Sequence, residues 1–181
     1  MKIPLDQIDF AILENLQNNA RLSNKELANR VHLAPSSCLE RVRRLTGAGV
    51  FRGFHAEVDP AALGQALQAM ITVRLRRHSR RDVLAFRNHL LALPEVLAVF
   101  HVGGSYDFVV HVAVRDSSHL RDLAMDAFTA RPEVGQMETH FIFEYTRSMT
   151  LPIPPDGKPG PAPRSPGGTK DVPPKIESRY K

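Results

Sequence analysis

Two neighbouring segments, residues 96–102 and 107–114, are apolar on both of the faces that a β-strand would present. In the first, VLAVFHV, Phe100 and Val102 fall on one face and Val99 on the other, and the second, DFVVHVAV, is apolar on both faces as well. Such strands have to be buried on both sides, so helices packed on one face leave the other face to be covered. A second copy of the chain is the simplest cover, and the sequence therefore predicts a homodimer.

The segments around this pair alternate between the two-residue period of strands and the longer period of helices. Strand patterns at 69–75 and 137–145 bound the region, and helical patterns at 81–93 and 117–130 separate the strands. The order strand, helix, strand, strand, helix, strand is that of a ferredoxin-like domain, which we place at residues 66–150. The predicted fold class is therefore α+β.

Residues 1–50 show helical patterns with short breaks between them. The first pattern covers residues 6–19, and the second, at 23–33, opens with a capping box formed by Ser23 and Glu26. Three compact helices, the last two tightly joined, are typical of a helix-turn-helix DNA-binding domain. The same arrangement also suits a protein–protein interaction module. The residues on the surface of the third helix distinguish a DNA-binding domain from such a module.

That third helix, LAPSSCLERVRRL at residues 33–45, has an apolar stripe of Cys38, Val42 and Leu45 at spacing i, i+4, i+7. Its other side carries hydroxyls, one carboxylate and guanidiniums. A recognition helix reads bases mainly with its N-terminal half, whereas a merely solvated polar face is the alternative. The candidate DNA-binding residues are Ser36, Ser37 and Glu40 for bases, Arg43 and Arg44 for phosphates, and Arg41, which is either a DNA contact or a structural residue.

The remaining segments bear on partners and location. Residues 51–65 continue a β-type run that Asp59-Pro60 breaks, and we expect a wing or a hinge strand here. Residues 151–181 hold most of the 14 prolines and an excess of basic residues, which predicts a disordered basic tail. The net charge of +5 favours an anionic partner. One cysteine, no signal-peptide pattern and no apolar run of about 20 residues predict a cytoplasmic protein away from membranes.

No pattern for catalysis or metal binding is found in the sequence. Eight histidines are scattered without the spacing of a zinc site, and phosphate-binding loops and nucleophile motifs are missing. We therefore expect a protein without enzymatic activity, metal or cofactor. Five arginines around the end of the first strand of the second domain form either a second phosphate-binding surface or a solvated corner: Arg74, Arg76, Arg77, Arg80 and Arg81.

Residues 5–147 resemble the leucine-responsive/AsnC family of transcription regulators. The stretch 5–59 is similar to that family's DNA-binding head, and GSYDF at Gly104–Phe108 is similar to its Gly-x-x-Asp-aromatic effector loop. Two signatures in the family's order, with the expected architecture between them, are more specific than either alone. The matching positions in the head are Asp9, Leu13, Leu16, Arg21, Leu27, Ala28, Arg41, Val42, Leu45 and Gly49.

The resemblance implies a regulator that binds double-stranded DNA and whose operator affinity or oligomeric state responds to a small amino acid or related metabolite. Such proteins form dimers that assemble further, to tetramers or octamers, with the amino acid bound between dimers. Glycine backbone N–H groups would approach the ligand carboxylate, and Asp107 would pair with its ammonium group. The candidate effector-binding residues are Gly103, Gly104, Tyr106, Asp107, Phe108 and Thr139.

Three residues depart from the family's pattern. Ala34 stands where a serine usually caps the recognition helix, Glu40 where a basic residue is common, and Gly103 where a hydroxyl residue is frequent. These departures leave the operator sequence and the effector open. The alternative function is a metabolite-sensing regulatory subunit that acts on a partner protein without reading DNA.

Overall fold

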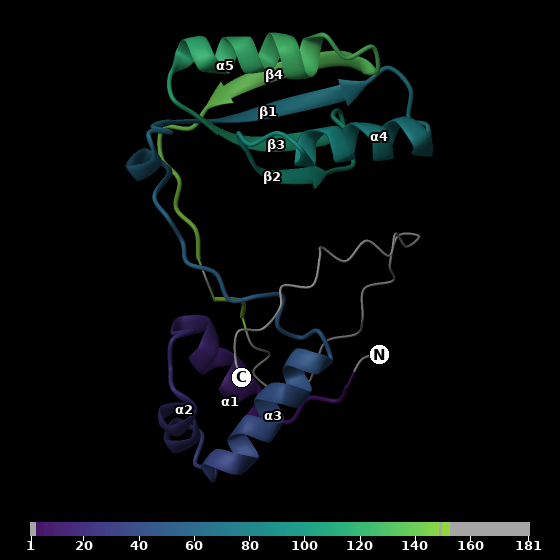
Figure 1. Cartoon of the computed structure of the whole chain (residues 1–181). Helices are drawn as coiled ribbons and strands as arrows, with labels where there is room; N and C mark the ends of the chain where they lie inside the picture. The colour runs from purple at the N-terminus through teal and green to yellow at the C-terminus, as the bar shows by residue number, and fades with distance from the viewer. Residues whose placement is uncertain (1–2, 149, 153–181) are drawn as a thin grey trace. The chain divides into compact units, whose positions relative to one another are not determined.

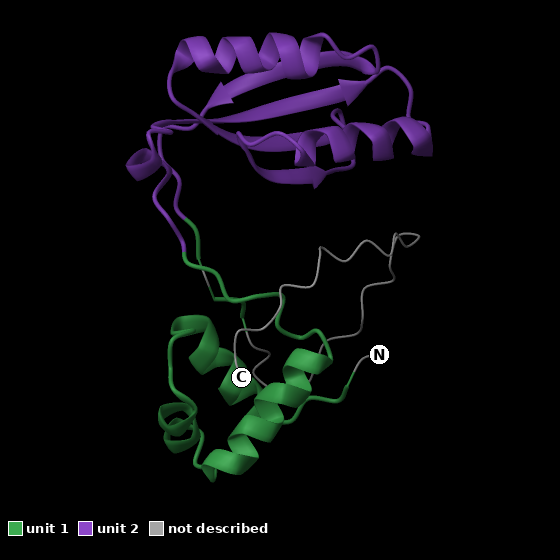
Figure 2. Ribbon diagram, viewed as in Figure 1, with its two compact units in different colours: residues 1–56, 147–181 green, residues 57–146 purple. Residues whose placement is uncertain are grey.

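The computed structural model describes residues 3–148 and 150–152 of the chain (Figure 1). The described residues divide into two compact units (Figure 2), and residues 57–146 make up the second of them. The first unit contains the N-terminal helices together with a short returning segment, in which Leu151 N donates to Gln17 Oε1 at 2.6 Å. The tail predicted at 151–181 lies outside the described residues from position 153 onward.

The first unit contains the three predicted helices: α1 (Gln7–Asn18), α2 (Asn24–Arg30) and α3 (Pro35–Gly47). Capping boxes begin the first two helices, and the predicted box of Ser23 and Glu26 is confirmed. Helix α2 ends earlier than predicted because the chain turns through His32, which has a left-handed φ of 55°. The core joins all three helices through Ile12, Leu16, Leu27, Ala28, Val31, Cys38 and Leu45.

No strand is present between residues 3 and 66 of the described chain, so the wing or hinge strand expected after α3 is not seen. A strand needs a neighbour for its N–H and C=O groups, and within the described residues no other segment supplies one here. Val50 and Phe51 pack instead against the core of the first unit, and the Phe51 and Phe54 rings lie 5.3 Å apart. A short 3-10 helix, η1 (Pro60–Leu63), then leads towards the sheet.

The second unit has the predicted order of strands and helices. Its sheet runs β2-β3-β1-β4 with every neighbouring pair antiparallel, which is the ferredoxin-like arrangement. The elements are β1 (Leu67–Leu75), α4 (Arg80–Leu91), β2 (Val96–His101), β3 (Phe108–Val114), α5 (Ser117–Leu123), its π-helical continuation η2 (Ala124–Thr129) and β4 (Val134–Phe141). Strand β4 lies earlier in the chain than the predicted 137–145, since Phe141 is its last residue.

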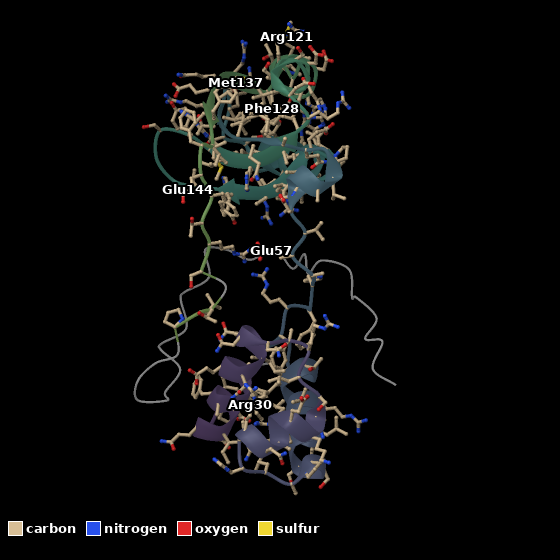
Figure 3. All side chains as sticks on the ribbon, turned by 90° about the vertical axis from the view of Figure 1, so that its left-hand side faces the viewer. Arg30, Glu57, Arg121, Phe128, Met137 and Glu144 are labelled. Atoms are coloured by element: carbon tan, nitrogen blue, oxygen red, sulfur yellow. The ribbon has the colours of Figure 1, made fainter. Side chains whose placement is uncertain are left out.

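Helices α4 and α5 cover one face of this sheet (Figure 1). Three phenylalanines tie the layers together, because the Phe86 ring meets Phe108 edge-on at 5.3 Å and Phe128 at 6.3 Å. All three side chains are fully buried, and Figure 3 shows Phe128 surrounded by other side chains of the second unit. The helix-covered face is therefore a well-filled core.

The opposite face of the sheet has no helix over it. Phe100 pairs with Val109 across β2 and β3, so both side chains lie on this face, and Phe100 is half exposed. Nearer β1, the Nε2 atom of His111 lies 2.8 Å from Gln68 Oε1, and the Tyr145 ring lies 5.3 Å from the imidazole. The prediction of apolar residues on both faces, with helices over only one, is confirmed for the strands β2 and β3.

Candidate nucleic-acid interface and effector loop

Helix α3 presents a polar face because its apolar residues are held in the core. Cys38 and Leu45 are fully buried, whereas Ser36, Ser37 and Arg43 are exposed. The side chains of this exposed set, which also includes Glu40, make no hydrogen bond or ion pair with any other residue in the part of the chain that the structure describes. These four side chains are thus available to an external partner.

The beginning of α3 is open as well. Ala34 occupies the N-cap position without a side-chain hydrogen bond, and Pro35 follows it. Asn24 Nδ2 donates to the Pro35 carbonyl at 2.8 Å, which ties the start of α2 to the start of α3. The first N–H groups of a helix carry partial positive charge and accept anions, so this end suits a phosphate group.

A buried carboxylate fixes α3 against α1. Asp9 has no exposed surface, and its Oδ1 lies 2.9 Å from Arg41 Nη1 while its Oδ2 lies 2.5 Å from Arg44 Nη2. Arg41 Nη1 also lies 2.7 Å from Asp6 Oδ2. Partial burial raises the pKa of Asp6, but the Asp9 N–H and Arg41 outweigh it and hold that pKa below its usual value. These ion pairs determine how α3 sits on the first unit.

This network changes the reading of two candidate DNA-binding residues. Arg41 and Arg44 are paired with acids of α1 and its cap, so neither is a free guanidinium on the outer face. Of the two roles left open for Arg41, the structural one fits the geometry. The signal for the network lay in Asp9, which shares the apolar stripe of α1 with Ile12 and Leu16; a buried carboxylate there needs a cation.

The predicted effector loop connects β2 to β3 and is held closed by Asp107. The Val102 N–H donates to the Asp107 carbonyl at 2.9 Å, and the Asp107 N–H donates to Val73 O at 2.8 Å. The carboxylate accepts from Leu75 N at 2.7 Å and lies 2.7 Å from His78 Nδ1. Asp107 therefore joins the loop to the end of β1. The contact of His78 with Asp107 was not predicted, because His78 lies in an irregular segment that has no pattern in the sequence.

The tip of the loop is open. No heavy atom outside the neighbouring residues lies within 4 Å of where a Cβ would stand on Gly103 or Gly104. Gly104 has a φ of 127°, which a residue with a side chain rarely adopts, so glycine is needed there. A hydrogen bond with Glu138 raises the pKa of the Tyr106 phenol, which places this ring towards β4.

The structure places two of the predicted effector residues on the helix-covered side of the sheet. Phe108 is fully buried and packs on Phe86 in the helix-side core, because the first residue of β3 points to that face. Thr139 pairs with Ile71 and so shares the helix-covered face, whereas Glu138, the partner of Tyr106, lies on the other face. The structure therefore does not bring Phe108 or Thr139 together with Tyr106.

Across residues 3–148 and 150–152 there is no group of three or more metal-ligating side chains placed to hold an ion. Within the same residues no helix is long and apolar enough to cross a membrane.

Two family models match the chain. The first, described as winged helix-turn-helix DNA-binding, matches residues 5–52, and the second, the Lrp/AsnC ligand binding domain, matches residues 68–151. The first therefore covers the helices α1 to α3, and the second covers the sheet from the second residue of β1 onward.

Known proteins and solved structures agree with these matches. The HTH-type transcriptional regulator AldR of Mycolicibacterium smegmatis is 43% identical over 146 residues, covering 81% of this chain and 85% of the relative. The leucine-responsive regulatory protein of Escherichia coli K12 is 34% identical over 140 residues, covering 77% and 85%. The transcriptional regulator NMB0573 of Neisseria meningitidis, solved with L-Met, superposes with a TM-score of 0.77 at 32% identity, covering 82% and 97%. The chain belongs to the Lrp/AsnC family of DNA-binding transcriptional regulators.

Proposed function

We propose that this regulator reads its operator with the outer face of α3, using Ser36, Ser37 and Glu40 towards bases and Arg43 towards phosphate. The observation that supports this assignment is the set of four exposed side chains without partners in the described chain, on a helix fixed by Asp9. Hydroxyls donate to phosphate or base acceptors, and a carboxylate accepts from cytosine. Arg41 and Arg44 act as positioning residues.

Replacing Arg43 by alanine should weaken operator binding and lower its salt dependence. One lost phosphate contact reduces the slope of log affinity against log salt by about one. Fluorescence anisotropy of a labelled duplex from upstream of the protein's own gene, titrated at several salt concentrations, measures both quantities. The matched control is Arg121→Ala, because Arg121 lies on the outside of the second unit (Figure 3) and is paired with its neighbour Asp122.

Unchanged affinity and slope in Arg43→Ala would contradict the assignment of this face. A peptide of residues 151–181 serves as a second reference for non-specific binding. If the wild-type chain binds the duplex no better than this peptide, the protein does not read DNA, and the alternative function as a metabolite-sensing subunit of a partner protein is favoured.

We also propose that the loop between β2 and β3 takes part in sensing a small amino acid. Its glycine tip is uncrowded, and Asp107 beside it supplies a carboxylate, now held by Leu75 N and His78, that could exchange its partner for an ammonium group. The Neisseria relative was solved with L-Met, which makes methionine a suitable first probe. Gly103, Gly104, Tyr106 and Asp107 remain in this proposal, whereas Phe108 contributes through the core.

The variant Asp107→Asn should remove the response to the amino acid while leaving operator binding without it unchanged. The amide oxygen still accepts from Leu75 N, but the charge that faces His78 and an ammonium group is lost. The operator titration is repeated with L-methionine and L-leucine, with Asp122→Asn on α5 as the matched control. A full response in Asp107→Asn would exclude Asp107 from the site.

The open face of the sheet is the surface through which we propose that two chains associate, as a dimer that can assemble further to a tetramer or octamer. Phe100 is half exposed there and lies beside Val109 on the same face. Stacked sheets are a common way to bury such a face. We infer in addition that the protein acts in the cytoplasm and catalyses no reaction, because its relatives are regulators of transcription.

A further inference from the structure

A hollow of about 450 Å³ lies on the second unit, at the end of the sheet where Asp107 joins the effector loop to β1, and is lined by arginines from three segments. Arg76 and Arg77 follow β1, Arg81 lies in the first turn of α4, and Arg131 precedes β4. These residues are far apart in the sequence and meet because β1 and β4 are neighbours in the sheet. The fold therefore creates this lining. The basic run in the sequence indicated Arg76, Arg77 and Arg81, but it did not indicate Arg131.

The position of Arg76 is fixed by its surroundings. Its backbone N–H donates to Glu133 O at 2.9 Å, and its Nε donates to Val134 O at 3.0 Å. A Cβ added to Gly135 would stand 3.1 Å from Arg76 Cγ, so the glycine leaves room for the stem of the arginine to lie against β4. A guanidinium whose Nε and stem are held in this way is pre-organised for a ligand.

The charges in the hollow do not balance. Glu133 lies 2.6 Å from Arg131, and Asp82 lies 3.8 Å from Arg81. Burial raises the pKa of Glu133, but its hydrogen bonds, including that from Arg131, outweigh this and lower the pKa, so the acid stays charged near neutral pH.

Within the described residues, neither Arg76 nor Arg77 has a carboxylate partner. Two of the four arginines are therefore uncompensated, and the N-terminal end of α4, which also borders the hollow, adds partial positive charge.

We propose that this hollow binds the phosphate group of a small phosphorylated metabolite, a second ligand site besides the effector loop. Guanidiniums pair with phosphate in a bidentate manner, and two uncompensated positive charges match a phosphate dianion. An amino-acid zwitterion fits less well. Its ammonium group would need a carboxylate, and the two acids of the hollow, Glu133 and Asp82, already lie beside Arg131 and Arg81. A concave site of this volume suits a nucleotide-sized ligand.

Isothermal titration calorimetry of the full-length protein tests the site, with inorganic pyrophosphate and ADP as probes in separate titrations. We expect saturable binding of one probe molecule per chain. Arg77→Ala should weaken it at least about tenfold, since the charge-assisted hydrogen bonds of one guanidinium are lost. Gly135→Ala should weaken it as well by displacing Arg76, while Arg121→Ala should leave it unchanged. Thermal unfolding of each variant without probe shows whether the fold is kept.

Absence of saturable binding in the wild type, or equal affinity in wild type and Arg77→Ala, would overturn the proposal. So would a third outcome, in which pyrophosphate and ADP do not bind but Arg77→Ala weakens binding of duplex DNA, because the arginines would then serve the DNA backbone. None of these results depends on Arg43 or Asp107, so failure here leaves the proposed function intact.

Discussion

Replacing Arg41 and Arg44 together by methionine is expected to destabilise the first unit by about 3–5 kcal/mol, the effect of leaving a buried charge without its partner. Asp9 would keep its place under α3, where it has no exposed surface, but would lose both guanidiniums. Methionine keeps much of the side-chain length. The loss of stability therefore measures the missing charges more than a change in packing. Urea unfolding of the full chain, followed by the helical circular dichroism signal, measures the change.

The control variant, Arg115→Met with Arg121→Met, removes the same charge from the second unit, where both side chains are exposed. A loss below about 1 kcal/mol, the scale of a surface ion pair, would mean that the Asp9 network does not hold α3.

The network predicts that DNA binding and stability are linked in this helix. Arg41 and Arg44 hold α3 from one side, while Arg43, between them in sequence, faces away. A variant at Arg44 would therefore change the position of the recognition face as well as its charge. Arg43→Ala is the cleaner test of contact with DNA for this reason.

Patterns that depend on neighbouring residues predicted the fold well. The capping box at Ser23 and the stripe of Cys38, Val42 and Leu45 are local, so the helices could be placed from the sequence. The sheet order followed from strands and helices whose connections are short. The run at 50–59 has a strand pattern too, but pairing depends on a partner strand elsewhere, and the sequence contains no information on that.

The site residues were predicted less well because side-chain partners are set by tertiary packing. The helical pattern places Arg44 towards solvent, and it does not show whether an acid of another helix pairs with the guanidinium. In the structure Asp9 of α1 forms that pair. Phe108 and Thr139 were assigned from the resemblance, which gives positions along the strands but not the face to which each side chain points. In the arginine hollow, Arg131 joins Arg76 only through the pairing of β4 with β1.

The second large effect is expected on the open face of the sheet, where Phe100→Glu should convert the proposed dimer into monomers. In the single chain Phe100 is half exposed, so the carboxylate is hydrated and the fold is kept. A twofold interface uses the same patch from both chains, so every substitution counts twice. Each buried carboxylate without a partner costs about 3–5 kcal/mol, and two of them raise the dissociation constant by more than about 10⁴-fold.

Sedimentation velocity at micromolar protein measures the mass, and circular dichroism shows whether the second unit is still folded. Leu91→Glu is the matched control, because Leu91 is a large apolar side chain, 63% exposed, on the helix α4 rather than on the open face. If Phe100→Glu keeps the mass of the wild type, the chains associate through another surface. If it becomes monomeric, its operator affinity should fall too, because two heads joined by the sheets bind two half-sites together and a single head binds one.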